Sequence, residues 1–332
     1  MCAILSLTKE DIINSFSMKN AIEAVKLAFS MYSSGKSTVP LRTNINVPPV
    51  QGQTLFMPAY CEVMNSLGIK IVSVFPKNVE KNKSVVSATM ILLDAITGEV
   101  CCLLDGTYLT QLRTGAATGA ACDLLARKGA KIGALVGTGG QASSQLEAML
   151  TSRHLEVLKI SGLNYKKTII FAENMRKLYG HFGTNIIAVE HPNEAVVDAD
   201  IITVVTSSKT PVFDGTLVKK GALISGVGSY TPFMQEIDEF TVCNANSIFV
   251  DSLDSVLVEA GDLIIPLDKG LIGKDKISGE LGDVLLGKLK GRKNEEEIII
   301  FKTVGIAIQD IITADAIYKK AVSLGIGTET KF

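Results

Sequence analysis

The chain has 332 residues, which is too long for one ordinary hydrophobic core and predicts two domains. Its 33 Lys and Arg residues balance 34 Asp and Glu residues, so the formal net charge is −1 and no global field attracts nucleic acid or an anionic membrane. Hydrophobic residues make up 47% of the chain, which excludes disorder, yet no apolar run approaches the roughly 18 residues of a spanning helix.

The chain opens with helical patterns and then changes to short strands. Thr8 and Asp11 form a pair resembling a capping box, and Ser17 caps a helix over Met18–Tyr32. From Val39 to Leu104, turn residues separate short β-like runs, which are Leu55–Met57, Gly68–Val74, Ser87–Leu93 and Val100–Leu104. Strands that follow one another in this way predict an antiparallel or mixed sheet.

After a helix of small residues over Thr114–Lys128, strands and helices alternate. Helical patterns over Gln141–Thr151 and Tyr165–Tyr179 separate apolar runs, and a last helix covers Ile306–Leu324. Asp315 interrupts the apolar face of that helix, so we expect the face not to be buried along its whole length. The alternation predicts an α/β fold with a parallel sheet covered by helices on both faces. The expected strands are Lys131–Val136, Leu155–Ile160, Asn185–Val189, Ile201–Thr206, Ala222–Gly226, Ser247–Asp251 and Ile298–Phe301.

Cysteine and histidine usage points to neither a metal site nor a His-centred triad. The six cysteines form no CxxC pair, and none of the three histidines has an acidic or Cys partner at a known spacing. Scattered reduced thiols, and an N-terminus without the pattern of a signal peptide, favour a cytoplasmic protein.

The sharpest local signal is a Gly-x-Gly-x-x-Ala turn at residues 137–142, with an apolar strand before it and a helix after it. Gly137 permits the tight turn, Gly139 lets the backbone approach a pyrophosphate, and Ala142 allows close packing of helix on strand. The helix N-terminus supplies N–H groups and a positive dipole end. This context favours a dinucleotide site over a glycine turn that is only structural.

The strand after this turn ends without the acidic residue that binds an NAD ribose. It runs instead into Ser161, Gly162, Leu163 and Asn164, with Lys166 close behind. The missing carboxylate removes repulsion of a 2′-phosphate, and Ser161, Asn164 or Lys166 could hydrogen-bond one. The pattern therefore favours NADP over NAD, although Lys166 and its neighbour also fit a solvated helix face.

Three basic residues of the first third stand in unusually apolar or glycine-rich surroundings. These are Arg42, Lys70 and Arg113. A charge in such a place must be paired, and cations without obvious acidic mates suit an anionic ligand such as a carboxylate. The alternative is that each snorkels or pairs with an acid of this chain, for which Glu10, Asp94 and Asp105 are the candidates.

Together these motifs resemble the ornithine cyclodeaminase/mu-crystallin family over nearly the whole chain. The segments that carry the resemblance are Ser17-Met18, Val39–Arg42, Phe56–Tyr60, Lys70 with Val74–Asn78, Asp105–Thr114, the glycine turn and Gly305–Asp310. The resemblance implies a Rossmann-type doubly wound parallel sheet in residues 119–305 that binds NAD(P). It also implies a second α+β domain in residues 1–118 and 306–332 for substrate binding and homodimer formation.

The resemblance also implies roles for individual residues. Arg42, Lys70 and Arg113 match carboxylate-binding and catalytic positions, and Arg113 and Thr114 match positions near the cofactor phosphates. Lys70 would either bind the carboxylate or relay a proton to the imine, and both roles stay open. The other cofactor positions expected are Gly137, Gly139, Gly140, Gln141, Ala142, Ser161, Asn164, Thr206, Val227 and Gly305, and Tyr230 and Val304 are expected to contact substrate.

Departures from the family pattern narrow the expected reaction. Ornithine cyclodeaminases carry an aspartate where this chain has Tyr230, and a threonine where it has Val85. A neutral phenol does not replace a carboxylate that must hold an ammonium group. We therefore expect NAD(P)H-dependent reduction of a small-molecule cyclic ketimine carboxylate, such as Δ1-pyrroline-2-carboxylate, to the L-amino acid. The alternatives are an amino-acid dehydrogenase of the alanine, arginine or opine type, an ornithine cyclodeaminase, and a binder of small ligands without catalysis.

Overall fold

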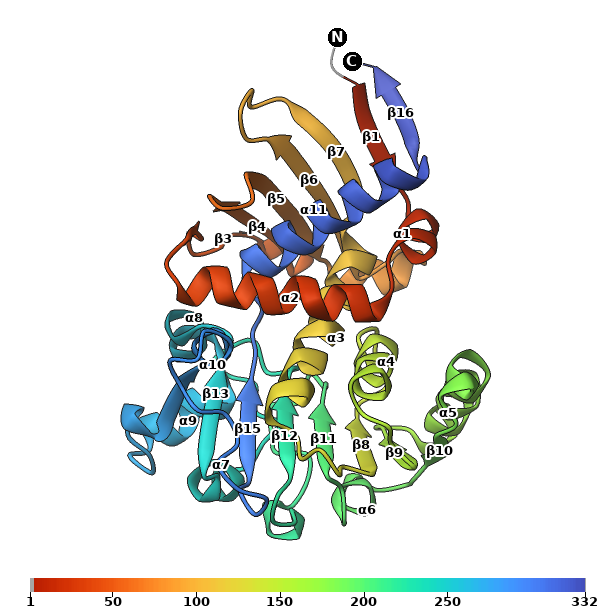
Figure 1. The fold of residues 1–332 in the computed structure, drawn as a ribbon. Helices are drawn as coiled ribbons and strands as arrows, with labels where there is room; N and C mark the ends of the chain where they lie inside the picture. Colours follow the sequence, from red (N-terminus) through yellow and green to blue (C-terminus); the bar gives the residue numbers. More distant parts are fainter. Residues whose placement is uncertain (1–2, 332) are drawn as a thin grey trace. The chain divides into compact units, whose positions relative to one another are not determined.

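The computed structural model describes residues 3–331, which form two compact units (Figure 1). Unit 1 combines the chain up to Arg113 with the segment from Ile306 onward, and unit 2 is Thr114–Gly305. The first division falls a few residues before the expected boundary at 118/119, inside one continuous helix, α3 (Gly106–Leu125). The binding roles of the two units stay predictions. Within the described residues, no helix has both the length and the apolar character needed to cross a membrane.

Unit 1 is built on an eight-stranded mixed sheet. Its strand order is β16-β1-β7-β6-β5-β4-β2, with β3 also paired to β4. All neighbours are antiparallel except β1 and β7, so the prediction of an antiparallel or mixed sheet is confirmed. Its elements besides the first part of α3 are β1 (Ala3–Leu7), α1 (Lys9–Ser15), α2 (Met18–Ser33), β2 (Ser37–Thr38), β3 (Thr43–Val47), β4 (Gly52–Cys61), β5 (Ser66–Val74), β6 (Val86–Asp94), β7 (Val100–Asp105), α11 (Ala307–Leu324) and β16 (Thr328–Lys331).

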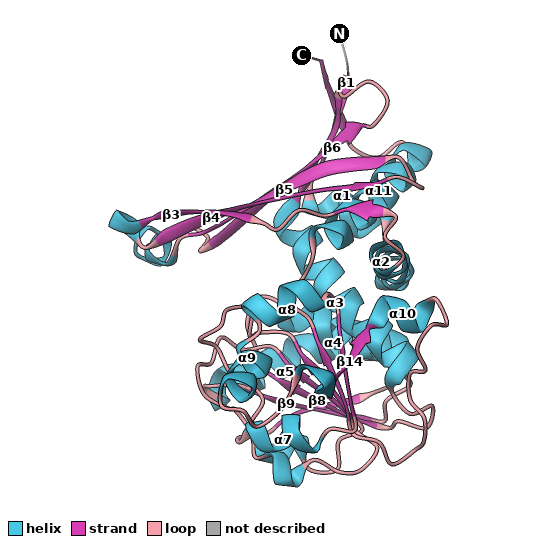
Figure 2. Ribbon diagram, turned by 90° about the vertical axis from the view of Figure 1, so that its left-hand side faces the viewer, coloured by secondary structure: helices cyan, strands magenta, loops and turns pink. Residues whose placement is uncertain are grey.

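Helices cover one face of this sheet. Thr8 and Asp11 form the predicted capping box of α1, and the Ser17 side chain accepts the Asn20 N–H at the start of α2. Helix α11 packs on β4, β5 and β6, and α2 packs on α11 (Figures 1 and 2). Helix α11 lies between the sheet and α2 and is buried from Ala307 through Asp315, whereas Val322 near its end is exposed. The apolar face is therefore not buried along its whole length, as expected, but it becomes exposed beyond Asp315 and not at it.

Unit 2 is a parallel eight-stranded sheet with strand order β10-β9-β8-β11-β12-β15-β13-β14. All of its strand pairs are parallel, which confirms the predicted fold class. The order reverses beside β8, so the carboxyl ends of β8 and β11 flank a topological switch point, where such folds bind ligands. Its elements after α3 are β8 (Ile132–Val136), α4 (Ala142–Ser152), β9 (Val157–Ser161), α5 (Tyr165–Tyr179), β10 (Asn185–Ala188), α6 (Pro192–Val196), β11 (Ile201–Val204), β12 (Leu223–Gly226), α7 (Glu239–Asn244), β13 (Ser247–Val250), α8 (Leu253–Glu259), α9 (Gly261–Asp268), β14 (Ile277–Glu280), α10 (Leu281–Leu285) and β15 (Ile299–Lys302).

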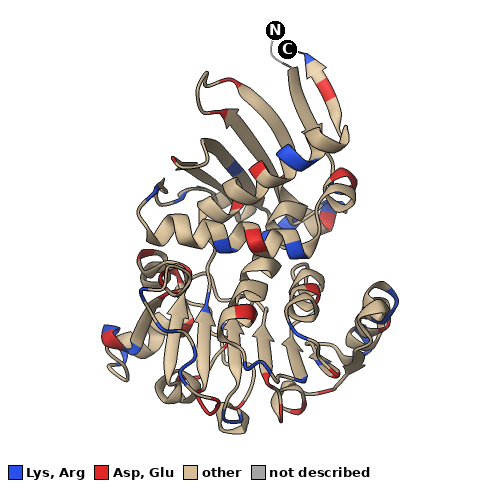
Figure 3. Ribbon diagram, viewed as in Figure 1, with Lys and Arg blue, Asp and Glu red and all other residues tan. Residues whose placement is uncertain are grey.

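Helices lie on both faces of the unit 2 sheet (Figure 2). Every second residue of a strand points to the same face of the sheet. On one face, such residues, among them Ile202, Ile224 and Ile300, form a buried cluster with the segments that cover it. On the other face, Thr203 Oγ1 donates to Met149 Sδ of α4. The strands of this unit are almost free of charged residues in Figure 3. A buried charged side chain at a strand end is costly, so it must be paired or hydrogen-bonded.

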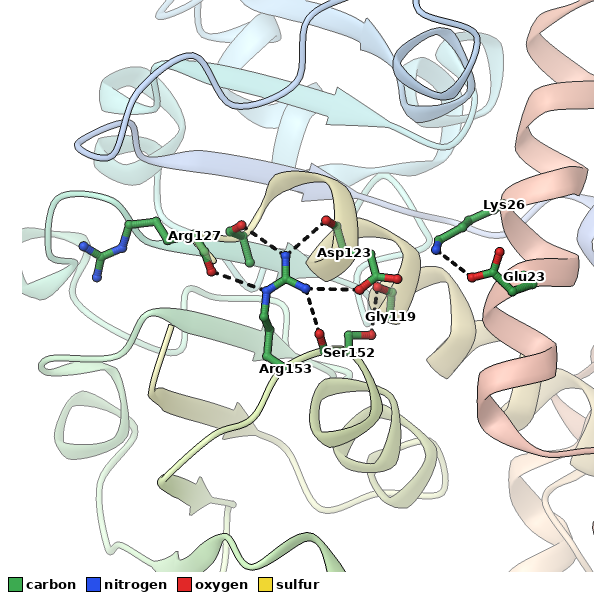
Figure 4. Close-up of polar contacts among 8 residues, drawn as sticks. Glu23, Lys26, Gly119, Asp123, Arg127, Ser152 and Arg153 are labelled. Carbon is green, nitrogen blue, oxygen red and sulfur yellow. Dashed lines mark hydrogen bonds and ion pairs between the residues drawn. The ribbon is translucent and has the colours of Figure 1, made fainter. Parts of the chain in front are cut away.

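Arginines satisfy the last carbonyl groups of α3 inside unit 2. Arg153 donates to the side chain of Asp123 and to the backbone carbonyls of Asp123, Ala126 and Arg127 (Figure 4). The Nε of Arg292 donates to the Leu125 carbonyl at 2.7 Å. Asp123 and Leu125 lie in the last turn of α3 and Ala126 and Arg127 follow it directly, so the two guanidinium groups act as its C-terminal cap.

Candidate active site

Three charged side chains meet in the core of unit 1. Asp310 of α11 accepts Lys70 Nζ on Oδ2 at 2.7 Å and Arg113 Nε on Oδ1 at 2.9 Å. Arg113 also donates through a terminal nitrogen to Gln309 Oε1 at 2.9 Å. Lys70, on β5, is 1% exposed and Asp310 is fully buried. We call Lys70, Arg113, Gln309 and Asp310 the ionic cluster.

The charges of the ionic cluster control one another's protonation. Burial lowers the pKa of Lys70 to about 8, Asp310 opposes the shift, and the charges of Arg113 and Arg42 add to it. Burial alone would raise the pKa of Asp310, but Arg113 and Lys70 hold it below its usual value. The cluster therefore holds two cations and one anion near neutral pH, and its surplus positive charge suits a carboxylate.

The structure brings together the basic residues singled out in the sequence. Lys70 and Arg113 share Asp310, and Arg42, half-buried in the segment between β2 and β3, acts on Lys70 through its charge. The acidic mate of Lys70 and Arg113 is Asp310, which was not among the candidate partners. The expectation that Lys70 and Arg113 lack an acidic mate was therefore wrong.

In unit 2 the glycine turn has the geometry of a phosphate site. Gly137 has φ +113°, and a Cβ there would lie 2.4 Å from the Val205 carbonyl oxygen, so only glycine fits. Nothing lies within 4 Å of a Cβ at Gly139. The Ala142 N–H donates to the Gly139 carbonyl at 3.0 Å, but Gln141 makes no side-chain cap for the N–H groups that follow, which suits an anion at the start of α4. These residues fit a dinucleotide pyrophosphate.

The other expected positions of unit 2 follow the carboxyl ends of its central strands. Thr206 follows β11, Val227 and Tyr230 follow β12, and Val304 and Gly305 follow β15. Tyr230 is 40% exposed, whereas Val227 and Val304 are buried. In Figure 1 the arrowheads of these strands lie at one edge of the sheet. The structure thus collects these residues at the edge that holds the glycine turn.

A buried carboxylate fixes the segment after β15. Asp251 Oδ2 accepts Thr303 Oγ1 at 2.6 Å, the Val304 N–H at 3.0 Å and the Gly305 N–H at 2.7 Å. Burial raises the pKa of Asp251, and these donors oppose the shift. The position of Val304 is therefore set by a side chain at the end of the neighbouring strand.

The residues expected to bind the cofactor at the end of β9 differ in burial and contacts, and their roles stay predictions. Ser161 is fully buried, and Asn164 caps α5 by accepting the Lys167 N–H at 3.0 Å. Lys166 and Lys167 are exposed in the first turn of α5. No carboxylate stands at Ser161, as the sequence states, and the nearest exposed side chains along the chain that carry an amide or an ammonium group are those of Asn164, Lys166 and Lys167.

Sequence reasoning missed three residues that organise these sites. Gln309 and Asp310 lie in the Gly305–Asp310 motif, yet they were not assigned a role, because their partners are distant in sequence. Asp251 ends a predicted strand, which is the one signal that could have singled it out. Among residues 3–331, no group of three or more His, Cys, Asp and Glu side chains is arranged to hold a metal ion.

Comparison with known proteins agrees with this picture. The model of the ornithine cyclodeaminase/mu-crystallin family matches residues 4–325. A Δ1-pyrroline-2-carboxylate reductase of Bacillus cereus is 37% identical over 319 residues, covering 96% of this chain and 97% of that protein. An alanine dehydrogenase of Archaeoglobus fulgidus is 33% identical over 331 residues, covering 99% and 98%. The structure of a Thermococcus litoralis Δ1-pyrroline-2-carboxylate reductase in complex with NADH and L-proline has a TM-score of 0.93 at 40% identity, covering 98% of this chain and 100% of that one.

Proposed function

The chain belongs to the ornithine cyclodeaminase/mu-crystallin family, and we propose that it reduces a cyclic ketimine carboxylate to the L-amino acid with NAD(P)H. The proposed substrate is Δ1-pyrroline-2-carboxylate and the product L-proline. The observation that carries the proposal is the ionic cluster, in which one carboxylate holds two buried cations and leaves a positive charge in excess. The relatives from Bacillus cereus and Thermococcus litoralis bear the name of this activity.

The residues of unit 2 provide the cofactor site of this proposal. Gly137, Gly139 and the uncapped start of α4 bind the pyrophosphate, with Gly140, Gln141 and Ala142 shaping the turn. When bound, the reduced nicotinamide supplies the hydride. Thr206, Val227 and Gly305 line the cofactor. Relatives with solved structures hold NADH or NAD, and the choice between NAD and NADP stays a prediction.

The ionic cluster provides the substrate site. Arg113 and Arg42 bind the imine carboxylate and orient it. The substrate contacts expected of Tyr230 and Val304, which belong to unit 2, stay predictions. The charged Lys70 raises the electrophilicity of the imine, either by giving the imine nitrogen a proton or by lying against the carboxylate. Asp310 keeps Lys70 protonated at neutral pH.

One experiment tests the activity and its main alternative. Oxidation of NADPH and NADH is measured with pyrroline-2-carboxylate, with piperideine-2-carboxylate, and with pyruvate plus ammonia. We expect the cyclic imines to be reduced at least about tenfold more efficiently than pyruvate plus ammonia. The similarity to an alanine dehydrogenase makes amino-acid dehydrogenation the second candidate, and a preference for pyruvate plus ammonia would establish it instead.

We also propose that the protein is a homodimer that uses the second face of the unit 1 sheet. The helices of unit 1 pack on the other face, and cross-strand neighbours on this one are apolar and half-buried. They include Phe56, Leu67, Ile69, Ile71, Ile91, Leu93 and Leu103. An apolar face of this extent suits an interface between subunits. Light scattering after size exclusion should give twice the chain mass, and the double variant Ile69→Lys, Ile91→Lys should give the single mass.

The cytoplasm is the proposed location. Cys61, Cys101, Cys102, Cys122 and Cys243 are all free thiols in the structure, and Cys2 lies outside the described residues. Free thiols persist in a reducing compartment. Fractionation of cells that produce the protein should recover it with cytoplasmic markers, and recovery from an oxidising compartment would contradict the proposal.

A further inference from the structure

We propose that Glu236 is a positioning residue, which holds the segments after β11 and β12 together and so fixes where Thr206 and Tyr230, one on each segment, lie. The proposal rests on the proposed reductase function for what these two residues do. Its structural part concerns unit 2 alone. Glu236 lies in the segment between β12 and α7, was not singled out in the sequence, and is fully buried.

The two oxygens of Glu236 serve two different strand ends. Oε1 accepts the backbone N–H of Thr206, just after β11, and Oε2 accepts the backbone N–H of Ser229 at 2.7 Å, just after β12. The Ser229 hydroxyl in turn donates to the Met234 carbonyl at 2.7 Å. One carboxylate thus replaces the ladder hydrogen bonds that these neighbouring strands lose where they end.

The two segments have no room to adjust if this contact is lost. A Cβ at Gly228 would lie 1.9 Å from the Thr206 carbonyl oxygen and 2.5 Å from Glu236 Oε1. The backbone after β12 therefore lies directly against the backbone after β11 and the carboxylate. A side chain at position 236 that cannot accept both N–H groups in this tightly packed space must therefore shift one segment or the other.

A second acid and a buried lysine hold Glu236 itself. Asp262 Oδ1 accepts the N–H groups of Glu236 at 2.6 Å and Ile237 at 3.0 Å. Asp262 Oδ2 lies 2.9 Å from Lys302 Nζ at the end of β15, and both side chains are almost completely buried. Burial raises the pKa of Glu236, and the charge of Lys302 opposes that shift. The ends of three adjacent strands, β11, β12 and β15, are thus tied through buried charges.

This arrangement couples the two sides of the proposed reaction. Thr206 is proposed to line the cofactor and Tyr230, next to Ser229, to contact the substrate. Because a single carboxylate holds both segments, loosening it changes both positions at once. Loss of Glu236 should therefore weaken cofactor binding and turnover together, beyond any loss of stability.

The substitution Glu236→Gln tests this with little change of shape. An amide offers one acceptor and one NH₂ donor, so it faces one of the two backbone N–H groups with a donor. In the cofactor-free protein, hydrogen exchange by mass spectrometry should become at least about tenfold faster in peptides that contain Thr206 and Ser229. The Kd for NADH, followed by its fluorescence in a chain without tryptophan, should rise at least about tenfold. The kcat for pyrroline-2-carboxylate should fall by a similar factor.

The chain offers a matched control in Asp200→Asn. Asp200 is also a buried carboxylate, and it accepts the backbone N–H groups of Lys131 at 2.7 Å and Ile132 at 2.9 Å, at the amino ends of the strands. This variant should lower Tm and speed exchange near residue 131, yet leave the Kd for NADH and kcat within about twofold of wild type.

The outcomes separate this proposal from the proposed function. Unchanged exchange at Thr206 and Ser229 in Glu236→Gln, or a Kd and kcat no worse than in Asp200→Asn, would overturn it. A wild-type protein that binds NADH but reduces no imine would refute the reductase, while exchange and Kd still decide the role of Glu236. If Glu236→Gln does not fold, Glu236→Asp serves instead, because its shorter carboxylate keeps the charge but cannot span both N–H groups. It should show the same faster exchange in at least one of the two segments and the same rise in Kd.

Discussion

Asp310 Oδ2 lies 2.7 Å from Lys70 Nζ, although 240 residues separate the two in the chain. The same carboxylate binds Arg113, so the charge of Lys70 depends on a residue of the last helix. A buried cation without such a partner loses its proton readily. Asp310 therefore determines over which pH range the proposed substrate site carries its full positive charge.

The first prediction concerns the pH dependence of the wild-type enzyme. The pKa of Lys70 is about 8, so its ammonium form dominates below that pH and is lost above it. Either role proposed for Lys70 needs the ammonium, so kcat/KM for the imine should fall about tenfold per pH unit above pH 8. In Lys70→Arg the guanidinium does not titrate, and this fall should disappear even if the rate is lower. A wild-type profile that stays flat to pH 10 would contradict the assignment.

The second prediction concerns Asp310→Asn. The change removes the anion that raises the pKa of Lys70, so the alkaline fall in kcat/KM should move to lower pH by more than one unit. The control is Asp315→Asn on the same helix, where the carboxylate pairs with the exposed Lys319 and should leave the profile unchanged. If the pH profile of Asp310→Asn had the same midpoint as those of wild type and Asp315→Asn, Asp310 would not control the pKa of Lys70.

The third prediction concerns Arg113→Ala. A charged hydrogen-bonded contact is worth about 2–3 kcal/mol, so kcat/KM for the imine should fall by at least about a hundredfold. Arg113→Lys keeps the charge but cannot reproduce the contacts to both Asp310 and Gln309, and it should lie between wild type and alanine. Steady-state kinetics check this, with Tm measured alongside. Activity of Arg113→Ala within about threefold of wild type would remove Arg113 from the site.

The fourth prediction is a preference for NADPH, since β9 ends at Ser161 without a carboxylate that would repel a 2′-phosphate. Kinetics with both cofactors measure it. Lys166→Ala, in the exposed first turn of α5, should raise KM for NADPH several-fold and leave KM for NADH unchanged. Lys177→Ala, in the last turn of the same helix, is the control. A clear preference for NADH would show that the end of β9 holds a ribose diol.

The fifth prediction is that L-ornithine yields no ammonia. Cyclisation requires a group that holds the δ-amine and accepts its proton, and a phenol such as that of Tyr230 does not supply the negative charge of the aspartate that cyclodeaminases carry there. Proline and ammonium are assayed with ornithine and a catalytic amount of NAD. Their appearance with wild type would refute the prediction, whereas a weak gain in Tyr230→Asp would support it.

Local patterns in the sequence were enough to predict much of the fold. The helix over Tyr165–Tyr179 has the predicted bounds, because the Asn164 cap and the apolar spacing are both local signals. Small residues predicted a helix from Thr114, but α3 begins at Gly106, since its start depends on the end of β7 rather than on its own pattern. β1 and β16 went unrecognised because each is short and forms a sheet only with strands that are distant in the sequence.

The candidate site shows the same division between local and distant signals. Gly137 could be read from its motif, because a positive φ between strand and helix requires glycine. Lys70 and Arg113 stood out as charges in apolar segments. Asp310 and Glu236 did not, since each acts on groups that only the folded chain brings near. Pairing across such distances leaves no periodicity in the sequence.

The chain ends have a consequence for the order in which the protein folds during synthesis. Unit 2 is one contiguous segment, and all of it is synthesised before α11 and β16 are made. The sheet of unit 1 waits for both, since α11 covers it and β16 pairs with β1, with Ala3 opposite Lys331. Until α11 and β16 are made, the apolar strands of unit 1 lack their cover and are prone to aggregate. Unit 1, which contains the first residues to be synthesised, is thus the unit that completes its folding last.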